Sequence, residues 1–372
     1  MCTKVALITN SVRGLLSFRK DLINVLNDKG AVVLGFAPDI SKNDITNLKK
    51  INVKPIKYLL NRTSVNPFFE VISIISLIKL FKKEKPHIVF CFQIKPAIYG
   101  SIAATLCHTN KIYVMIEGLG YLFTDNNLKT KIIRRITIGL FKIVLTRVKK
   151  VFFLNQEDRK EFIKNRIIKP DKSIVLGGIG VDLDEWKCIN KKESDISFIF
   201  IGRLLKEKGI MEFLRAAEFI KLRYPSIKFI VLGDVDSNPG SIKKEDILLY
   251  VKKGVIEWPG FVDIKPWLAK KSVFVLPSYY REGVPRSTQE AMAMGCPVIT
   301  TNSIGCRDTV INELNGYLVP PKNEVALAAA MEKFILHPEI IEPMGRESRL
   351  LAEKKFDAKK INKIIMKEIG LG

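Results

Sequence analysis

Apolar and polar positions follow two patterns along this chain, one typical of strands and one typical of helices. Short runs rich in Val, Ile and Phe are bounded by Gly, Pro or charged residues, and stretches with helical periodicity lie between them. Such runs are typical of parallel strands that are buried on both faces of a sheet. The alternation of strand and helix predicts an α/β protein with two doubly wound, Rossmann-like domains. The expected strands are Val5–Thr9, Val32–Ala37, Ile88–Phe92, Ile112–Ile116 and Val151–Leu154 in the first half, and Phe198–Ile201, Phe229–Leu232, Val273–Leu276 and Val298–Thr301 in the second.

The length of the chain supports this division into two domains. At roughly 150 residues per domain, 372 residues are too many for one ordinary core. The 47% of apolar residues exclude a disordered or fibrous chain. We place the boundary in the glycine-rich stretch 177–182, which gives domains at 1–178 and 179–350. The last segment, 351–372, contains a lysine-rich amphipathic helix that we expect to pack back on the first domain.

Positive charge is concentrated in the first half of the chain. The formal net charge is +23, and residues 1–180 hold 31 basic against 12 acidic residues. So broad an excess indicates an anionic partner, such as a membrane surface or nucleic acid. The stretches 68–85 and 128–150 mix aliphatic with basic residues, and neither is apolar enough to span a bilayer. Each fits either a core helix with one charged face or an amphipathic helix on anionic lipid, and together with the charge excess they favour the anionic membrane surface.

The cysteines and the start of the chain bear on its compartment. The six cysteines lie mostly among apolar neighbours and no pair has CxxC spacing, so we expect reduced thiols. The apolar run that follows Met1 is too short for a signal peptide. We therefore expect a cytoplasmic protein, held peripherally at the inner face of the cytoplasmic membrane.

Two loops in the second half are candidates for binding a nucleotide sugar. The first, GRLLKEKG at 202–209, directly follows an expected strand. Gly202 would let a ligand approach the backbone closely, as in many strand-to-helix turns. Arg203 and Lys208 would place two cations beside a helix N-terminus, an arrangement that suits a diphosphate. The same side chains could instead be surface charges around a helix cap.

The second loop, PSYYREGVPRSTQEAMAMGCP at 277–297, leads from a strand into a helix. A helix carboxylate at Glu290 can accept two hydrogen bonds from a ribose, and Glu282 in the loop can meet the hydroxyls of a hexose. The amides of residues 283–287 can donate to phosphate or sugar oxygens. Singly, Glu290 could be a first-turn acid and Glu282 a solvated charge. Because both loops follow strands of the same half, a nucleotide-sugar site is favoured.

The sequence resembles the retaining glycosyltransferases of family 4 in two segments, GRLLKEKG and EGVPRSTQEAMAMGCPVITTN. The resemblance implies the GT-B fold of that family, in which two Rossmann-like domains face each other across a cleft. A weaker likeness in the first half runs through Phe18-Arg19 and Lys95-Pro96. Residues 116–120 resemble bacterial enzymes that add N-acetylgalactosamine or a related sugar to undecaprenyl-diphosphate-linked saccharides. The resemblance implies that Arg203 and Lys208 hold the donor diphosphate, Glu290 the ribose and Glu282 the transferred sugar. Further donor contacts are expected from Gly202, Val262, Gly283, Val284, Pro285, Arg286 and Ser287, and acceptor contacts from Arg13, Gly14, Arg19 and Lys95.

The sequence departs from this family near the end of the strand 112–116. Many relatives carry a histidine there that faces the donor sugar, whereas this chain has Glu117 in that neighbourhood. Glu117 either contacts the donor sugar or orients the acceptor, or it caps a turn before Gly118. We retain Glu117 as a fourth candidate catalytic residue, beside Arg203, Lys208 and Glu282.

The resemblance also bears on mechanism and partners. It implies a UDP-sugar donor, of which UDP-N-acetylhexosamine is the first choice, and transfer with retention, in which the leaving phosphate takes the acceptor proton. The Asp-x-Asp sequences at 182–184 and 234–236 are expected to form turns rather than metal sites, and no cofactor is expected. The alternatives are a basic nucleic-acid-binding protein and a peripheral membrane scaffold without catalysis. Nucleic acid is not an expected partner, because no nucleic-acid-binding motif accompanies the charge.

Overall fold

A computed structural model of the chain describes residues 2–62, 66–120, 123, 127–187, 196–236, 238, 240–270 and 272–372. The chain forms two compact units, of which the first combines Met1–Ile179 with Ala358–Gly372 and the second is Gly180–Asp357. The chain returns to the first unit at Ala358 rather than at 351, because helix α13 (Ile341–Lys355) is still part of the second unit. Only the following helix, α14 (Ala358–Ile369), belongs to the first unit, where it packs on α1 (Lys20–Asp28).

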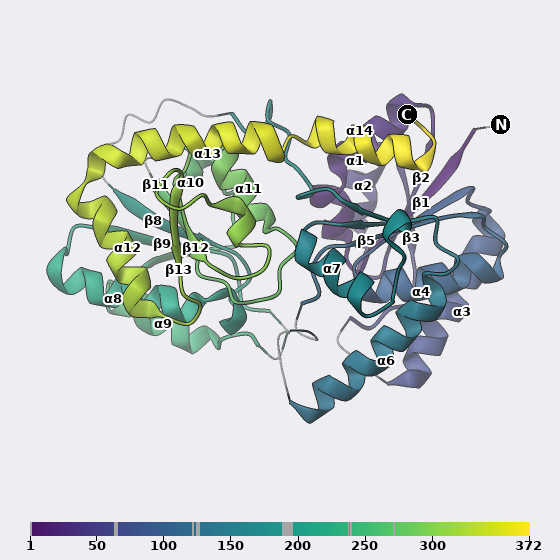
Figure 1. Cartoon of the computed structure of the whole chain (residues 1–372), viewed down its shortest axis with the longest axis horizontal. Coiled ribbons are helices and arrows are strands. Elements are labelled where there is room, and N and C mark those ends of the chain that lie inside the picture. Colours follow the sequence, from purple (N-terminus) through teal and green to yellow (C-terminus); the bar gives the residue numbers. More distant parts are fainter. Residues whose placement is uncertain are drawn as a thin grey trace. The chain divides into compact units, whose positions relative to one another are not determined.

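The first unit is built on a parallel sheet of seven strands (Figure 1). In spatial order these are β3 (Val53–Lys57), β2 (Val32–Ala37), β1 (Lys4–Ile8), β4 (Ile88–Phe92), β5 (Lys111–Ile116), β6 (Lys150–Phe153) and β7 (Ser173–Val175). The remaining elements are η1 (Gly14–Phe18), α2 (Lys42–Lys50), α3 (Pro67–Glu84), α4 (Ile94–Leu106), α6 (Leu128–Val144), α7 (Gln156–Lys164) and η2 (Pro170–Lys172).

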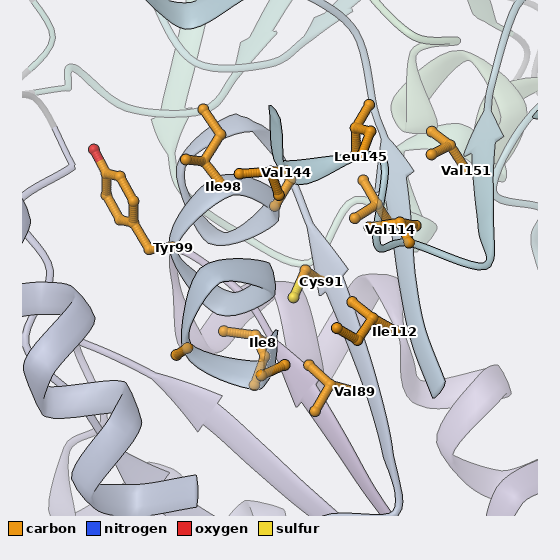
Figure 2. Packing of buried hydrophobic residues seen from close by; sticks show 14 of the residues in the cluster. Ile8, Val89, Cys91, Ile98, Tyr99, Ile112, Val114, Val144, Leu145 and Val151 are labelled. Atoms are coloured by element: carbon orange, nitrogen blue, oxygen red, sulfur yellow. The ribbon is translucent and has the colours of Figure 1, made fainter. Parts of the chain in front are cut away.

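Period-two alternation along these strands divides the core of the first unit between the two faces of the sheet. On one face, Ile8, Cys91 and Val114 pack with residues of α3, α4, α6 and α7 in one buried cluster. Figure 2 shows strand and helix side chains of this cluster meeting around Cys91. On the other face, Met115 of β5 lies near residues of α1 and α14. Both faces are covered, which explains why the strands are almost continuously apolar.

Local capping signals set the bounds of the two long helices that the sequence singled out. Asn66 caps α3, which begins with Pro67, and the helix ends where Lys85 takes a left-handed conformation (φ 49°). Asn127 caps α6 by accepting the Thr130 N–H at 2.8 Å. Among the described residues, no helix combines the length and the apolar character needed to cross a bilayer.

The second unit contains a parallel sheet of six strands. In spatial order these are β10 (Glu257–Gly260), β9 (Lys228–Leu232), β8 (Ser197–Ile201), β11 (Ser272–Leu276), β12 (Val298–Thr301) and β13 (Gly316–Val319). Its other elements are η3 (Lys206–Lys208), α8 (Ile210–Arg223), α9 (Lys244–Lys252), α10 (Lys265–Leu268), α11 (Arg286–Ala293), η4 (Arg307–Thr309), α12 (Glu324–Leu336), η5 (Pro338–Ile340) and α13. The prediction of two doubly wound α/β domains is confirmed, and all nine expected strands are present within a residue or so of their expected bounds.

Candidate active site

The strand order of the second sheet brings the two candidate loops together. The order reverses between β8 and β11, since β9 and β10 lie beyond β8 while β12 and β13 lie beyond β11. In open α/β sheets, ligands bind at the carboxyl ends of the strands at such a reversal. The loop with GRLLKEKG follows β8, and the loop 277–285 follows β11. The two sequence motifs therefore share the position where this architecture favours a ligand.

Direct hydrogen bonds tie these two loops to each other. The carbonyl oxygen of Glu207 accepts the backbone N–H groups of Tyr279 and Tyr280, each at 2.9 Å. The Ser287 hydroxyl, in the first turn of α11, donates to the carbonyl oxygen of Ile201 at the end of β8 at 3.0 Å. The loops are thus held as one rigid assembly, which fixes the side chains that they carry.

Gly209 is the glycine that this close approach requires. It has a left-handed backbone (φ 78°), and a Cβ added to it would lie 2.2 Å from the carbonyl oxygen of Pro277. At Gly202, where a ligand is expected to approach the backbone, an added Cβ would make an ordinary contact of 3.7 Å with the Phe200 ring. Gly209, the last glycine of GRLLKEKG, is therefore the one that lets the two loops meet.

The cations of the first loop lie beside acids. The Lys208 ammonium forms an ion pair with Glu282, and both side chains are mostly buried, at 14% and 11% exposure. The Ser278 hydroxyl also donates to Glu282 Oε1 at 3.0 Å. Arg203 is more open, with Nη1 3.5 Å from Oδ2 of Asp236. Two of the predicted donor cations and one predicted acid are therefore gathered at the ends of β8, β9 and β11.

The second turn of α11 holds the remaining predicted acid. Glu290 pairs with Arg286 at 2.9 Å, one turn earlier on the same helix. The N-cap residue, Pro285, makes no side-chain hydrogen bond to the N–H groups at this helix start. Gly283 and Val284, which lead into the helix, are buried. An N-terminus of this kind, on a helix that starts beside the paired charges, is suited to phosphate oxygens.

Gln289 anchors the candidate helix α11, and the sequence reasoning missed it. It is fully buried, and its Oε1 accepts the backbone N–H of Gly180 at 3.0 Å. Arg286 also donates to the carbonyl oxygen of Gly180. Both hydrogen bonds join α11 to the glycine with which the second unit begins, a contact between positions more than 100 apart that no local pattern reveals.

Val262 lies farther from the paired charges along the sheet. It follows β10, the edge strand, and β9 separates that strand from β8. Val262 is half-buried, and its neighbour Phe261 is exposed. The loop after β10 is thus at the same carboxyl edge as the two motif loops, two strands away.

A cysteine lies beneath the loop that carries Glu282. Cys306 is fully buried, and burial raises the pKa of its thiol to about 11, with a further contribution from the Glu282 carboxylate. At neutral pH this thiol is protonated and has little nucleophilic character. Burial likewise raises the pKa of Tyr279 to about 12, with Glu212 and Glu207 nearby. Cys306 and Tyr279 therefore stay protonated across the physiological range.

In the first unit, the strand order reverses between β1 and β4, and Glu117 follows β5 next to them. Glu117 forms an ion pair with Arg19, and it accepts a hydrogen bond from Nε2 of Gln93. Arg19 is only 3% exposed, with its guanidinium carbon 4.2 Å from the centroid of the Phe92 ring. Arg19, for which an acceptor contact is predicted, therefore faces Glu117, which itself is 14% exposed.

Gln93 holds this cluster in place and was also missed by the sequence reasoning. Its backbone has φ 65° and ψ 169°, a combination that side-chain-bearing residues rarely adopt. Its side-chain oxygen accepts the Asn10 N–H at 3.3 Å, so one side chain joins the ends of β1, β4 and β5. Strained backbone of this kind is concentrated at functional sites.

The other predicted acceptor residues differ in accessibility. The Lys95 ammonium pairs with Glu70 of α3 at 2.6 Å. Arg13 is exposed beside η1. Gly14 is buried, and an added Cβ would lie 3.1 Å from Cβ of Thr9, so any side chain there would crowd the end of β1.

The Asp-x-Asp sequences form local hydrogen bonds. Asp182 Oδ1 accepts the Asp184 N–H at 2.9 Å, and Asp234 Oδ1 accepts the Val235 N–H at 2.8 Å. Asp236 accepts the Asn238 N–H at 2.9 Å in addition to facing Arg203. Within the part of the chain that the structure describes, no three His, Cys, Asp or Glu side chains are grouped as metal ligands would be.

Comparison with known protein families agrees with this geometry. The family described as "Glycosyl transferases group 1" matches residues 195–337, and "Glycosyl transferase 4-like" matches residues 4–155. The chain belongs to the glycosyltransferases of family 4. The first match covers both motif loops of this glycosyltransferase, and the second covers nearly all of its first sheet.

Individual relatives of the glycosyltransferase are similar over most of its length. An N,N'-diacetylbacillosaminyl-diphospho-undecaprenol α-1,3-N-acetylgalactosaminyltransferase of Campylobacter jejuni is 26% identical over 336 residues, 86% of each chain. A UDP-Gal:α-D-GlcNAc-diphosphoundecaprenol α-1,3-galactosyltransferase of Escherichia coli is 30% identical over 260 residues, 66% of each chain. A crystal structure of HepE from Anabaena in complex with UDP-glucose has a TM-score of 0.78 at 17% identity, with 99% of each chain covered. The predicted family, GT-B fold and enzymatic activity are thus confirmed.

Proposed function

We propose that this glycosyltransferase moves a hexose, most simply an N-acetylhexosamine, from a UDP-sugar to a saccharide carried on a lipid diphosphate, in the assembly of a cell-surface polysaccharide. The observation that carries the proposal is the position of the Lys208–Glu282 ion pair and of Arg203 at the carboxyl ends of the strands around the sheet reversal, beside a start of α11 whose N-cap residue makes no side-chain cap. Relatives named for undecaprenyl-diphosphate-linked acceptors, and a neighbour solved with UDP-glucose, support the choice of substrates.

The donor diphosphate is assigned to the two cations and to the start of α11. Lys208 and Arg203 would take phosphate oxygens, and the amides of residues 283–287 would donate to the same group. The Lys208 ammonium is held by Glu282 in the free enzyme, so it is already positioned and needs little reorganisation when an anion arrives. Because negative charge grows on the departing phosphate, each such donor contributes roughly 2–4 kcal/mol to the transition state.

The two acids are assigned to hydroxyl groups of the donor. Glu290, on the first turns of α11, would accept hydrogen bonds from the ribose, and Glu282 would accept them from the transferred sugar. Val262, in the loop after β10, would flank the uracil. In this arrangement the diphosphate lies between the sugar and the nucleoside, as the covalent order of a UDP-sugar demands.

Transfer is proposed to proceed with retention of the anomeric configuration and without a metal ion. The bond between the anomeric carbon and the diphosphate oxygen breaks, and the acceptor oxygen bonds to the same face of the sugar. The acceptor proton passes to the phosphate oxygen that has just left, so no side-chain base is needed. The support for metal independence is the pair of cations, Lys208 and Arg203, which offset the charge of the diphosphate.

Acceptor contacts are proposed for the first unit. The lipid diphosphate would contact Arg13, which is exposed, and Gly14, which keeps the chain close to β1. Lys95 would leave its ion pair with Glu70 and bind the same diphosphate. Arg19 is reassigned as a positioning residue that acts through Glu117. Lipid-linked acceptors of this class would place the enzyme at the cytoplasmic face of the membrane.

The test begins with donor binding. Thermal shifts are measured with UDP-N-acetylglucosamine, UDP-N-acetylgalactosamine, UDP-glucose, GDP-mannose and ADP-glucose, and we expect a shift with a UDP-N-acetylhexosamine. Transfer to synthetic undecaprenyl-diphosphate-linked N-acetylhexosamine is then followed by mass spectrometry, with and without EDTA, and the new linkage is assigned by NMR. The absence of any nucleotide-sugar shift would overturn the donor site. An inverted linkage would refute retention, and activity that EDTA removes and Mn²⁺ restores would refute metal independence.

A further inference from the structure

Helix α6 presents an apolar stripe to solvent. The stripe consists of Leu128 (76% exposed), Ile132 (50%), Ile136 (58%), Leu140 (36%) and Ile143 (70%). Spacings of four, four, four and three place these side chains along one side of the helix. The opposite side is built into the core of the first unit, where Phe141 and Val144 belong to the buried cluster. The exposed side of α6 is therefore not the solvated charged face that a surface helix normally has.

A row of basic side chains runs beside this stripe. Lys131, Arg135 and Lys142 are exposed and follow each other at helical spacings along its edge. The sequence of α6, LKTKIIRRITIGLFKIV, contains no acidic residue. An aliphatic surface that is lined by cations and lacks acids matches an anionic lipid interface in both its apolar and its charged part.

Helix α3 repeats this combination. Phe68 (70% exposed), Phe69 (50%), Val71 (55%) and Ile75 (46%) are exposed over its first half. Its second half carries exposed lysines, among them Lys79. Both α3 and α6 pack against α4 and lie on the same face of the first sheet (Figure 1). Exposed apolar and basic side chains thus gather on one helical layer of this unit.

We propose that the apolar stripe of α6, assisted by α3, inserts into the headgroup region of an anionic bilayer and holds the enzyme there. The aliphatic side chains would enter the boundary between headgroups and acyl chains while Lys131, Arg135 and Lys142 pair with lipid phosphates. Nucleic acid would engage the cations but leave the five aliphatic side chains in water, so it fits this surface less well. The inference concerns attachment and is independent of the residues assigned to catalysis.

The electrostatic part is tested by vesicle sedimentation of the full chain. We expect binding to vesicles of phosphatidylcholine with 30% phosphatidylglycerol and little binding to pure phosphatidylcholine. Each basic residue near an anionic surface strengthens binding about five-fold, so K131Q/R135Q/K142Q should bind about 100-fold more weakly. The matched control, K42Q/K49Q/K50Q, removes three exposed charges from α2, which packs against β3 and η1. An equal loss in the control would mean that net charge, rather than this surface, drives binding and would overturn the proposal.

The apolar part is tested with I132S/I136S. This variant should lose at least ten-fold in vesicle affinity at a salt concentration that screens the charges, with its circular dichroism and melting temperature unchanged. The control F219S/L222S removes two exposed apolar side chains from α8 of the second unit and should bind like the wild type. Vesicle binding by I132S/I136S as tight as that of the wild type would overturn the proposed insertion. The proposal would also be overturned if the wild-type protein is a dimer in sedimentation equilibrium and I132S/I136S is a monomer, because the stripe would then be a contact between copies of the chain.

Discussion

Replacement of Lys208 by alanine tests the donor site most directly. The ammonium lost in this variant is the less exposed of the two cations assigned to the diphosphate. Loss of one preorganised donor to a developing charge costs about 2.7–4 kcal/mol in the transition state, so kcat/KM should fall about 100- to 1000-fold. The affinity for UDP should also fall, because UDP carries the same charged group.

The same substitution should destabilise the second unit only moderately. It leaves the Glu282 carboxylate, 11% exposed, with the Ser278 hydroxyl as a donor. Breaking a fully buried ion pair costs about 3–5 kcal/mol and breaking an exposed one less than about 1 kcal/mol, which suggests about 2 kcal/mol here. For a unit of this size that loss lowers Tm by about 4–8 °C, and the variant stays folded at 25 °C.

The assay separates these two effects. UDP binding by calorimetry and UDP release from the preferred donor are measured at 25 °C, and Tm is measured in parallel. K253A is the matched control, because it breaks the Lys253–Glu218 pair, which is 2.7 Å long and exposed, in the same unit. The control should retain wild-type turnover and UDP affinity. A folded K208A enzyme with wild-type kcat/KM would refute the diphosphate assignment, and with it the reasoning from the sheet reversal.

Two further predictions concern the support of this site. Gly209→Ala should lower the stability of the second unit by about 3 kcal/mol, because the added Cβ would lie 2.2 Å from the Pro277 carbonyl oxygen. The control Gly254→Ala, at a glycine with φ 69° and nothing within 4 Å of the added Cβ, should cost only about 1 kcal/mol. Equal Tm values for the two variants would contradict the close approach at Gly209. The pKa of Cys306 is raised to about 11, against an ordinary 9.0, so the folded state holds the thiol proton more tightly than the unfolded state does. The stabilisation that this thiol contributes to folding is therefore fully present below pH 9 and is lost as the pH rises from 9 to 11. Thiol titration at pH 8 should label exposed Cys2 but not Cys306 until the protein unfolds, and C306A should lose less stability than the wild type between pH 9 and 11.

The strands that sequence patterning missed share one physical property. They are β3, β7, β10 and β13, the two edge strands of each sheet. An edge strand has a neighbour on one side only, so it need not be continuously apolar and it tolerates proline, as Pro55 in β3 and Pro259 in β10 illustrate. The interior strands are buried on all sides and therefore carry the short apolar runs that made them recognisable.

The same contrast separates the candidate residues of the second unit from those of the first. In the second unit, Arg203 and Lys208 lie within one loop. Glu282 and Glu290 lie within one loop-helix segment, and the strand order brings this segment next to that loop. Local spacing was therefore sufficient to predict that the segments carrying these residues lie close together. What it could not give was the partner of each charge, because the pairing of Lys208 with Glu282 joins positions that only the sheet reversal brings together.

In the first unit the candidate cluster depends on contacts that spacing does not encode. Glu117 was recognised as unusual, but its partner Gln93 follows β4, and its partner Arg19 lies between η1 and α1. The strained backbone of Gln93 leaves no trace in its residue type, since glycine would be the usual choice at φ 65°. A glutamine there gains the bonds to Glu117 and to the Asn10 amide that glycine cannot make. The strain at Gln93 is thus the cost of the two hydrogen bonds by which its side chain links Glu117 to the end of β1.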